Sequence, residues 1–344
     1  FALCEHQLVS LTGIPQDVKA IKYERPELSS SNFSHGKGVA ESQQTTTKII
    51  EESTDELNAT ARSFVHLHVH SQYSVGIMQS TSEVASIVAH AAALGSEEFP
   101  PTIALTDHGN MMAAFQFVAE CQKQKVKAIV GCEVNLCRDM HDKTHQDNGY
   151  QIPLLAMNKK GYHNLAMLSS LAHTQGQYYV PRIDRNTILQ YKDDIIVLSG
   201  GLFGEVSYKI LNEGEEKAEE ALLWWHEHFG DRFYVELIRH GLDEENHVNR
   251  VLLELCAKHN IRYVAGNSSY YTKMSDSKAQ DALVCVREGE FLSRPKKYVG
   301  KRGRDFRFGL TNDEYYLKSG AEMSQLFQDL PDAILETRRL ADRC

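Results

Sequence analysis

The sequence predicts an α/β protein whose core is a seven-stranded parallel (β/α)7 barrel, similar to the eight-unit TIM fold. Short apolar segments alternate with amphipathic segments of helical length, and seven such units follow one another from Phe64 onward. Strict alternation of strand and helix implies right-handed parallel crossovers. An open, doubly wound sheet is the alternative, and both architectures form sites at the carboxyl ends of their strands.

The apolar patterns give each element a residue range. The expected strands are residues 64–70, 102–107, 127–136, 150–157, 194–200, 232–240 and 261–267. Helical periodicity predicts helices between them, over residues 82–94, 111–124, 164–173, 215–229 and 244–260.

The chain divides into three parts by composition. Residues 1–61 are polar and rich in Ser and Thr, which predicts a linker or the tail of a preceding domain, disordered or irregular. Residues 62–290 contain the barrel pattern, and residues 291–344 form a basic loop followed by a helical segment. Because the chain starts at Phe1 and stops at Cys344 inside a helical pattern, we expect a fragment of a longer protein.

Composition and charge exclude several classes of protein. No apolar run approaches the roughly 20 residues that cross a bilayer, so no membrane partner is expected. Seven cysteines without a Cys-x-x-Cys pair form neither a zinc-finger pattern nor a disulfide framework, which favours a reducing, cytoplasmic setting. The net charge of −9 argues against a nucleic-acid surface spread over the whole chain.

A local nucleic-acid contact is still conceivable in the stretch from Arg294 to Gly309. Basic side chains there neutralise phosphates, and the interleaved Tyr and Phe rings can stack on bases. A solvated, glycine-containing loop explains the same stretch at least as well. The candidate nucleic-acid-binding residues are Lys296, Lys297, Lys301, Arg302 and Arg304.

Metal-binding residue types collect at the predicted strand ends. Imidazole and carboxylate are ligands of Zn²⁺, Mn²⁺ and Fe²⁺, and a closed parallel sheet would bring these ends to one rim. Taken singly, each residue has a structural explanation, such as a helix cap for Asp107 or a turn for His240. Taken together, the strand-end residues predict a polar rim that can hold a metal ion; they are His68, His70, Asp107, His108, Glu133, His240, Asn267 and Ser268. His66 fits a buried hydrogen-bonding group that holds its neighbours in place.

The three histidines at alternate positions carry a further expectation. His66, His68 and His70 alternate with Val65, Leu67 and Val69. Because alternate residues of a strand share a face, all three imidazoles should lie on one side of the sheet.

These motifs resemble the polymerase and histidinol phosphatase (PHP) domain. The opening motifs of that family are similar to "FVHLHVHSQYS", "ALTDHGNM" and "VGCEVN", and "GYHNLAMLSSLA" and "FYVELIRHG" resemble the branch at the amino end of bacterial replicative DNA polymerase III alpha subunits. The resemblance covers residues 64–344. It implies a seven-stranded barrel of PHP type and a metal site for Zn²⁺ or Mn²⁺. The positions that match the family's ligands are His68, His70, His108, Glu133 and His240, with His66 and Asp107 supporting them.

Four positions depart from the family pattern. An Asp expected near Ile77 is missing, Gln151 and Tyr270 stand where the family has His, and Ser268 stands where it has Asp. Serine and glutamine are poor ligands for these ions. We therefore expect a degenerate metal site, without an assigned catalytic residue, that serves structure or partner docking. The alternative is an active metal-dependent 3′–5′ exonuclease or phosphoesterase. A phosphatase for histidinol phosphate is disfavoured by the polymerase-type motifs.

The resemblance also implies a context for the parent protein. Such a parent is a DNA-directed DNA polymerase, a nucleotidyltransferase of DNA replication that uses Mg²⁺ on a palm domain beyond the PHP region. The expected partners are DNA through the parent polymerase, replisome subunits and a proofreading exonuclease. This chain alone should not extend DNA.

Overall fold

The computed structural model describes residues 60–76, 79–96, 98–300 and 305–344. All of them belong to one compact unit, Asn58–Cys344. The linker or tail predicted for residues 1–61 lies almost wholly outside the described residues. None of the helices that the structure describes is long and apolar enough to cross a membrane.

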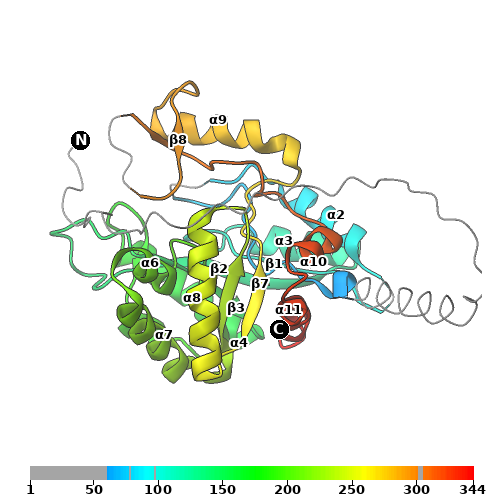
Figure 1. Ribbon diagram of the computed structural model, residues 1–344, viewed down its shortest axis with the longest axis horizontal. Coiled ribbons are helices and arrows are strands. Elements are labelled where there is room, and N and C mark those ends of the chain that lie inside the picture. The colour runs from blue at the N-terminus through cyan, green and yellow to red at the C-terminus, as the bar shows by residue number, and fades with distance from the viewer. Residues whose placement is uncertain (1–59, 77–78, 97, 301–304) are drawn as a thin grey trace, which may run out of the picture. The chain divides into compact units, whose positions relative to one another are not determined.

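A curled, mostly parallel sheet forms the centre of this unit and confirms the α/β class (Figure 1). Its order is β1-β2-β3-β5-β6-β7, with the short β4 beside β2. The strands are β1 Thr102–Leu105, β2 Lys127–Leu136, β3 Tyr150–Ala156, β4 Arg182–Ile183, β5 Ile195–Leu198, β6 Phe233–Ile238 and β7 Tyr263–Gly266. A separate pair of two-residue strands, β8 Lys296–Lys297 and β9 Arg307–Phe308, follows.

Strand β3 runs against the predicted direction. It is antiparallel to both β2 and β5, whereas β1–β2, β5–β6 and β6–β7 are parallel. The reason lies in the connection, because residues 137–149 between β2 and β3 contain no helix. A parallel neighbour needs a crossover, which is usually helical, while a loop lets the chain return directly beside the strand that it left.

Residues 64–70 join the two edges of the sheet without forming a regular strand. His66 bridges to Ile103 of β1, and Val69 bridges to Ser269 just after β7. Backbone hydrogen bonds run from Ala104 N to His66 O at 2.9 Å and from His70 N to Ser269 O at 3.1 Å. The predicted first strand is therefore an irregular connecting segment, in the place expected for it.

The expectation that the three imidazoles share one face was wrong. Val65 and Leu67 pack in the barrel interior with side chains from β1, β2, β3, β5, β6 and β7. His66 points the other way, with its Nε2 2.8 Å from the carbonyl oxygen of Lys318. A bend at His68 then breaks the alternation, so His68 turns inward, where its ring meets Glu236 of β6.

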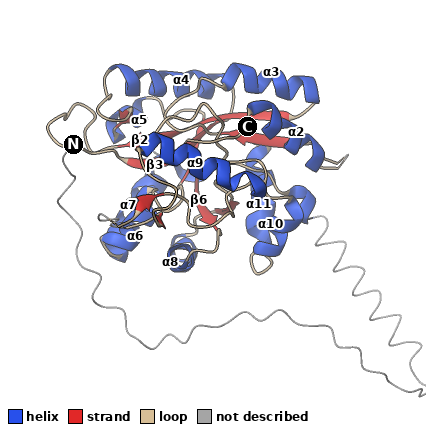
Figure 2. Ribbon diagram, turned by 90° about the horizontal axis from the view of Figure 1, so that it is seen from above, coloured by secondary structure: helices blue, strands red, loops and turns tan. Residues whose placement is uncertain are grey.

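Helices surround the sheet and bury its outer face. Helices α3 and α4 lie along one side, and α6, α7 and α8 lie along another (Figure 2). All five individually predicted helices are confirmed, while α5, α6, α9 and α10 were not predicted. The helices are α2 Val84–Leu94, α3 Ala114–Gln124, α4 Lys159–Thr174, α5 Arg185–Gln190, α6 Glu205–Asn212, α7 Glu215–Phe229, α8 Asp243–His259, α9 Ser277–Glu288, α10 Gly320–Leu326 and α11 Pro331–Ala341, with single 3₁₀ turns at Gly230–Arg232 and Met274–Asp276.

Helix α4 starts five residues before its predicted first residue because of a cap. The side chain of Asn158 accepts hydrogen bonds from the backbone N–H groups of Lys160 and Gly161. Such a cap satisfies donors that have no partner within the helix, so the helix extends back to it.

The C-terminal helical segment is part of the barrel rather than an appendage. Leu340 and Ala341 of α11 belong to the interior cluster, and Lys127, the first residue of β2, donates to the carbonyl of Ala341 at 2.7 Å. The backbone N–H of Val65 donates to Thr337 Oγ1 at 3.0 Å. Helix α11 thus covers the amino ends of the strands and leaves the carboxyl ends for the polar residues.

We predict that His66 makes stability depend on pH. Burial, reinforced by the neighbouring His90, lowers the pKa of His66 from 6.5 to about 3. As the pH falls below 6.5, His66 becomes protonated in the unfolded chain but stays neutral in the folded protein. The stability that neutral His66 contributes is therefore complete above pH 6.5 and is lost as the pH falls toward 3. We compare the free energy of unfolding at pH 7 and at pH 5 by urea denaturation. Between these two pH values it should fall by about 2 kcal/mol less in His66→Gln than in the unsubstituted protein.

The exposed His163 supplies the control for this measurement. His163→Gln should leave the pH dependence unchanged. Equal losses of stability in His66→Gln and in the unsubstituted protein would contradict the prediction.

Candidate metal site

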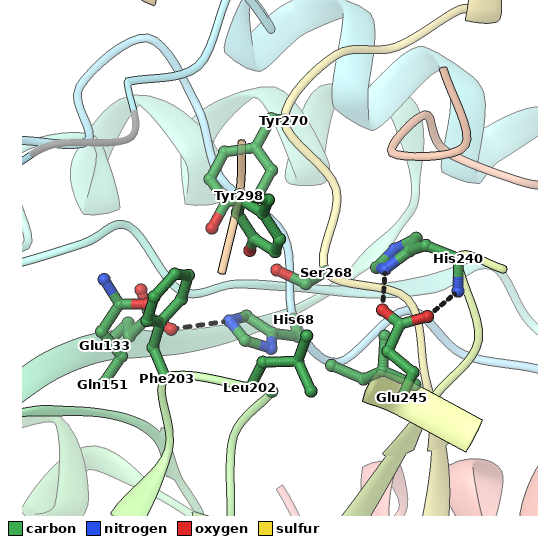
Figure 3. Close-up of a pocket in the computed structure, with 12 residues that line it drawn as sticks. His68, Glu133, Gln151, Leu202, Phe203, His240, Glu245, Ser268, Tyr270 and Tyr298 are labelled. Carbon is green, nitrogen blue, oxygen red and sulfur yellow. Dashed lines mark hydrogen bonds and ion pairs between the residues drawn. The ribbon is translucent and has the colours of Figure 1, made fainter. Parts of the chain in front are cut away.

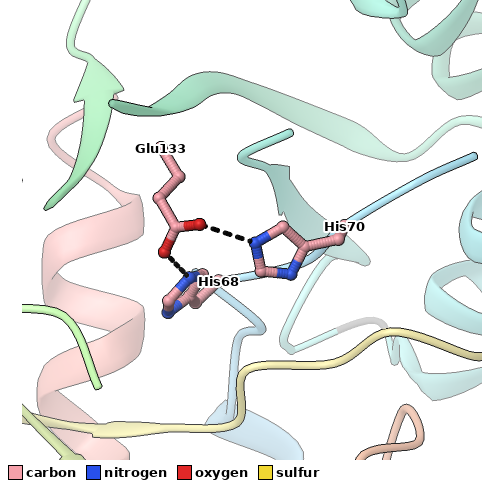
Figure 4. A group of neighbouring side chains, drawn as sticks. All are labelled: His68, His70 and Glu133. Atoms are coloured by element: carbon pink, nitrogen blue, oxygen red, sulfur yellow. Dashed lines mark hydrogen bonds and ion pairs between the residues drawn. The ribbon is translucent and has the colours of Figure 1, made fainter. Parts of the chain in front are cut away.

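Three imidazoles converge on the carboxylate of Glu133 at the carboxyl ends of the strands. His68 Nε2 lies 3.0 Å from Oε1, and His70 Nε2 lies 3.3 Å from Oε2 (Figure 4). His108 Nδ1 lies 2.6 Å from Oε2. All four side chains are buried. The structure thereby brings together four of the five predicted ligands.

Local backbone features place these side chains. The bend at His68 turns its ring inward, Glu133 lies in β2, and His108 follows β1 and bridges to Glu133. Gly76 has a φ of +138°, and a Cβ there would come within 2.9 Å of the His108 ring. Only glycine suits both the conformation and the space, so Gly76 is part of the support for His108.

The charges of the cluster compensate one another. Burial alone would lower the pKa of His68, but Glu236 and Glu133 outweigh it and raise that pKa to about 10. Burial alone would raise the pKa of Glu133, but hydrogen bonds from His108, His68 and His70 hold it well below its usual range. The metal-free cluster therefore contains an ionised carboxylate and an imidazolium.

The fifth predicted ligand, His240, lies on the same cavity. Its Nδ1 is 2.9 Å from Glu245 Oε1, and its ring stacks on Tyr315 with centroids 4.0 Å apart. Its Nε2 is buried and has no hydrogen-bond partner among the described residues. The cavity has a volume of about 20 Å³ and is lined by His240, His68 and Glu133 among others (Figure 3).

The donor set fits a metal ion. Ligand atoms of His68, His70 and Glu133 all lie within 4.8 Å of one another. The Nδ1 atoms of His68, His70 and His240 face acceptors, namely Glu236, the carbonyl of Ser269 and Glu245. Each imidazole can therefore present Nε2, and nitrogen together with carboxylate oxygen suits Zn²⁺ or Mn²⁺.

The two residues predicted to support the ligands occupy different places. Asp107 accepts hydrogen bonds from Ser71 N at 2.6 Å, Ser71 Oγ at 2.7 Å and Ser74 Oγ at 2.8 Å. It thereby fixes the turn that follows His70. His66 lies on the outer face beside His90 and Lys318, away from the Glu133 cluster.

Three of the four departures from the family pattern line the same cavity. They are Gln151, Ser268 and Tyr270, whereas Ile77 lies outside the described residues. The Tyr270 ring stacks on His70 with centroids 4.3 Å apart and planes 4° apart. Burial raises the pKa of Tyr270 well above its usual value, so this side chain remains a neutral phenol.

The basic segment is only partly described. Lys296 Nζ lies 3.8 Å from an Asp281 carboxylate oxygen, which is also bound by the buried Arg307. Lys297 Nζ lies 5.9 Å from the centroid of the Phe306 ring. The remaining candidates, Lys301, Arg302 and Arg304, lie outside the described residues. A nucleic-acid contact at this segment stays a prediction.

Sequence reasoning missed two carboxylates at the site, Glu236 and Glu245. Glu236 was detectable in principle, as a charged residue inside the apolar strand Phe233–Ile238. Glu245 gave no such signal, because acidic residues are common in the first turn of a helix.

The fold and the rim define the class of protein: an α/β barrel domain with a cluster of imidazoles and a carboxylate that could hold a metal ion. The chain belongs to the PHP domain family, whose model matches residues 66–240. DNA polymerase III subunit alpha of Treponema pallidum is 38% identical over 287 residues, and that of Borreliella burgdorferi is 34% identical over 285 residues. Each alignment covers 82% of this chain, but only 23% and 24% of the relative, so the chain spans about a quarter of their length.

One solved structure illustrates how distant the structural neighbours are. An amidohydrolase from Chromobacterium violaceum aligns with 60% of this chain and 87% of its own, at a TM-score of 0.36 and 12% identity.

We predict that metal binding releases a proton. With a pKa of about 10, His68 carries protons on both ring nitrogens near pH 7.5. A metal ligand must give up the proton on its donor nitrogen. Calorimetric titration with Zn²⁺ in buffers of different ionisation enthalpy should therefore show release of about one proton per ion. Binding without proton release would contradict the assignment of His68 as a ligand.

Proposed function

We propose that this chain is the PHP region of a bacterial replicative DNA polymerase III alpha subunit, and that it serves mainly as a structural and partner-docking domain with a degenerate metal site. The observation that carries the proposal is the lining of the cavity. Gln151, Ser268 and Tyr270 contribute an amide, a hydroxyl and a phenol where a cluster of several ions would need imidazoles and a carboxylate.

The remaining donors suffice for one ion. Ligand atoms of His68, His70 and Glu133 lie within 4.8 Å of one another, and His240, which lines the same cavity, has a buried Nε2 without a partner among the described residues. We infer that these four residues, with His108 behind Glu133, would hold a single Zn²⁺ or Mn²⁺. When bound, such an ion would act as a Lewis acid and would also cross-link distant parts of the chain.

The size of the cavity argues against hydrolysis of DNA. Its volume of about 20 Å³ is close to the roughly 10–15 Å³ that one water needs. Phe203, Tyr270 and Tyr298 line it, and the Phe203 and Tyr298 rings lie 5.1 Å apart. So small a cavity offers little room for a phosphodiester beside His68 and Glu133.

The parent protein we propose is a DNA-directed DNA polymerase of the cytoplasm, with Mg²⁺ on a palm domain that is not part of this chain. The sequence identity between this chain and DNA polymerase III alpha subunits supports this context. Its partners would be DNA, other replisome subunits and a proofreading exonuclease. Lys296 and Lys297, with Lys301, Arg302 and Arg304, would supply a local contact to nucleic acid.

The second candidate function is a metal-dependent 3′–5′ exonuclease or phosphoesterase. The cluster of three imidazoles on Glu133 favours it, because these residues could still activate a water at one ion. Two-metal hydrolysis, however, needs two ions about 3.5–4 Å apart. Gln151, Ser268 and Tyr270, which line the same cavity, are poor ligands for a second ion.

Metal content and nuclease activity test the proposal together. We expect no more than one Zn²⁺ or Mn²⁺ per chain by mass spectrometry under native conditions, and a higher melting temperature when it is bound. His68→Ala should lose the ion and that stabilisation, whereas the exposed His163→Ala should keep both. End-labelled single-stranded DNA and primer–template DNA should remain intact with either ion.

Metal-dependent digestion that His68→Ala abolishes and His163→Ala preserves would establish the nuclease and overturn the scaffold proposal. Two or more tightly bound ions per chain would contradict the proposal that the degenerate site holds a single ion.

A further inference from the structure

Two buried carboxylates outside the predicted ligand set each hold one histidine of the site. We propose that Glu236 and Glu245 are positioning residues: they bind the Nδ1 atoms of His68 and His240, so that both rings direct Nε2 to the same ion. This inference rests on the proposed metal site and extends it from the ligands to the groups that orient them.

Glu236 is placed by β6 with its carboxylate against His68. Its side chain is completely buried, and its two oxygens lie 3.1 and 3.0 Å from His68 Nδ1. Among the described residues, Glu236 forms an ion pair with His68 and with no Lys or Arg side chain. A buried anion is costly unless it is paired, so the pairing with His68 accounts for its presence in an apolar strand.

The neighbouring strand leaves room for this carboxylate. In β7, a Cβ on Gly266 would lie 2.4 Å from Glu236 Oε1. The φ of Gly266 is not positive, so the conformation does not demand glycine. The missing side chain therefore provides space for Glu236, which makes the contact with His68 a feature of two strands rather than of one side chain.

Glu245 performs the same task for His240 from the first turn of α8. Its Oε1 is 2.9 Å from His240 Nδ1, and its Oε2 accepts from the backbone N–H of His240 at 2.6 Å. Because a carboxylate oxygen accepts, Nδ1 donates to Glu245, and Nε2 is the nitrogen available to a ligand. That Nε2 is buried without a partner and faces the cavity, so a ligand there would satisfy it.

His70 shows the same arrangement with a different partner. Its Nδ1 faces the carbonyl oxygen of Ser269 at 3.1 Å, while its Nε2 faces Glu133. His68 and His70 from one segment and the distant His240 thus each direct Nδ1 to an acceptor outside the cluster and leave Nε2 for the site. Such outer partners fix the tautomer and orientation of a ligand and raise its basicity.

Isosteric substitutions test the proposal. Glutamine offers one acceptor in place of two, so Glu245→Gln cannot bind both the backbone and the ring of His240 as the carboxylate does. We expect Glu236→Gln and Glu245→Gln each to raise the dissociation constant for Co²⁺ about 10- to 100-fold in competition with a chelator. The visible spectrum of the bound Co²⁺ should keep its shape, because the ligands themselves remain.

The matched control is Glu219, whose carboxylate binds Nε2 of His259 far from the cavity. Glu219→Gln also removes one carboxylate from a Glu–His pair, but it should leave the affinity for Co²⁺ unchanged. Gly266→Ala provides a second variant that keeps all charges and displaces Glu236; it should weaken binding as Glu236→Gln does. Circular dichroism establishes which variants are folded.

A second measurement on the metal-free protein separates this inference from the proposed function. Nitrogen NMR of the imidazoles should show His240 protonated on Nδ1, and Glu245→Gln should shift it toward a mixture of tautomers. Failure of the unsubstituted protein to bind Co²⁺ would refute the metal site alone. Unchanged affinity in the folded glutamine variants and in Gly266→Ala, together with an unchanged His240 tautomer, would overturn the positioning role.

Discussion

The buried carboxylate of Glu133 is the constraint on which the rest of the site depends. An ionised group inside a protein requires partners, and here three imidazoles supply them from the segment before β1 and from the end of β1. The same contacts fasten residues 64–70 to β2. One charge therefore both organises the rim and holds the connecting segment in the barrel.

The irregular course of residues 64–70 follows from these demands. A regular strand would place His66 and His68 on one face, but the interior has to receive Leu67 as well as His68. The bend at His68 allows both, and the flanking backbone still bonds to β1 on one side and to the residues after β7 on the other. The strand geometry is interrupted at His68, the residue whose side chain has to reach Glu133.

The cavity of this PHP domain combines metal-binding side chains with neutral ones. The rim retains the carboxylate and the imidazoles nearest to it, while Gln151, Ser268 and Tyr270 face the same small cavity. The Tyr270 ring stacks on His70, so Tyr270 fills its part of the cavity by packing. These neutral side chains are the basis on which we propose a structural and docking role rather than turnover.

The sequence by itself determined the α/β class, the five main helices and the five candidate ligands, because periodicity and residue type are local properties. Only the tertiary structure decided that β3 is antiparallel, that His66 faces outward and that Glu236 and Glu245 contact His68 and His240. These features depend on contacts between distant residues, such as the 168 positions that separate His68 from Glu236. A pattern along the chain carries no information about which partner a buried charge will meet, since that is settled by the closure of the sheet.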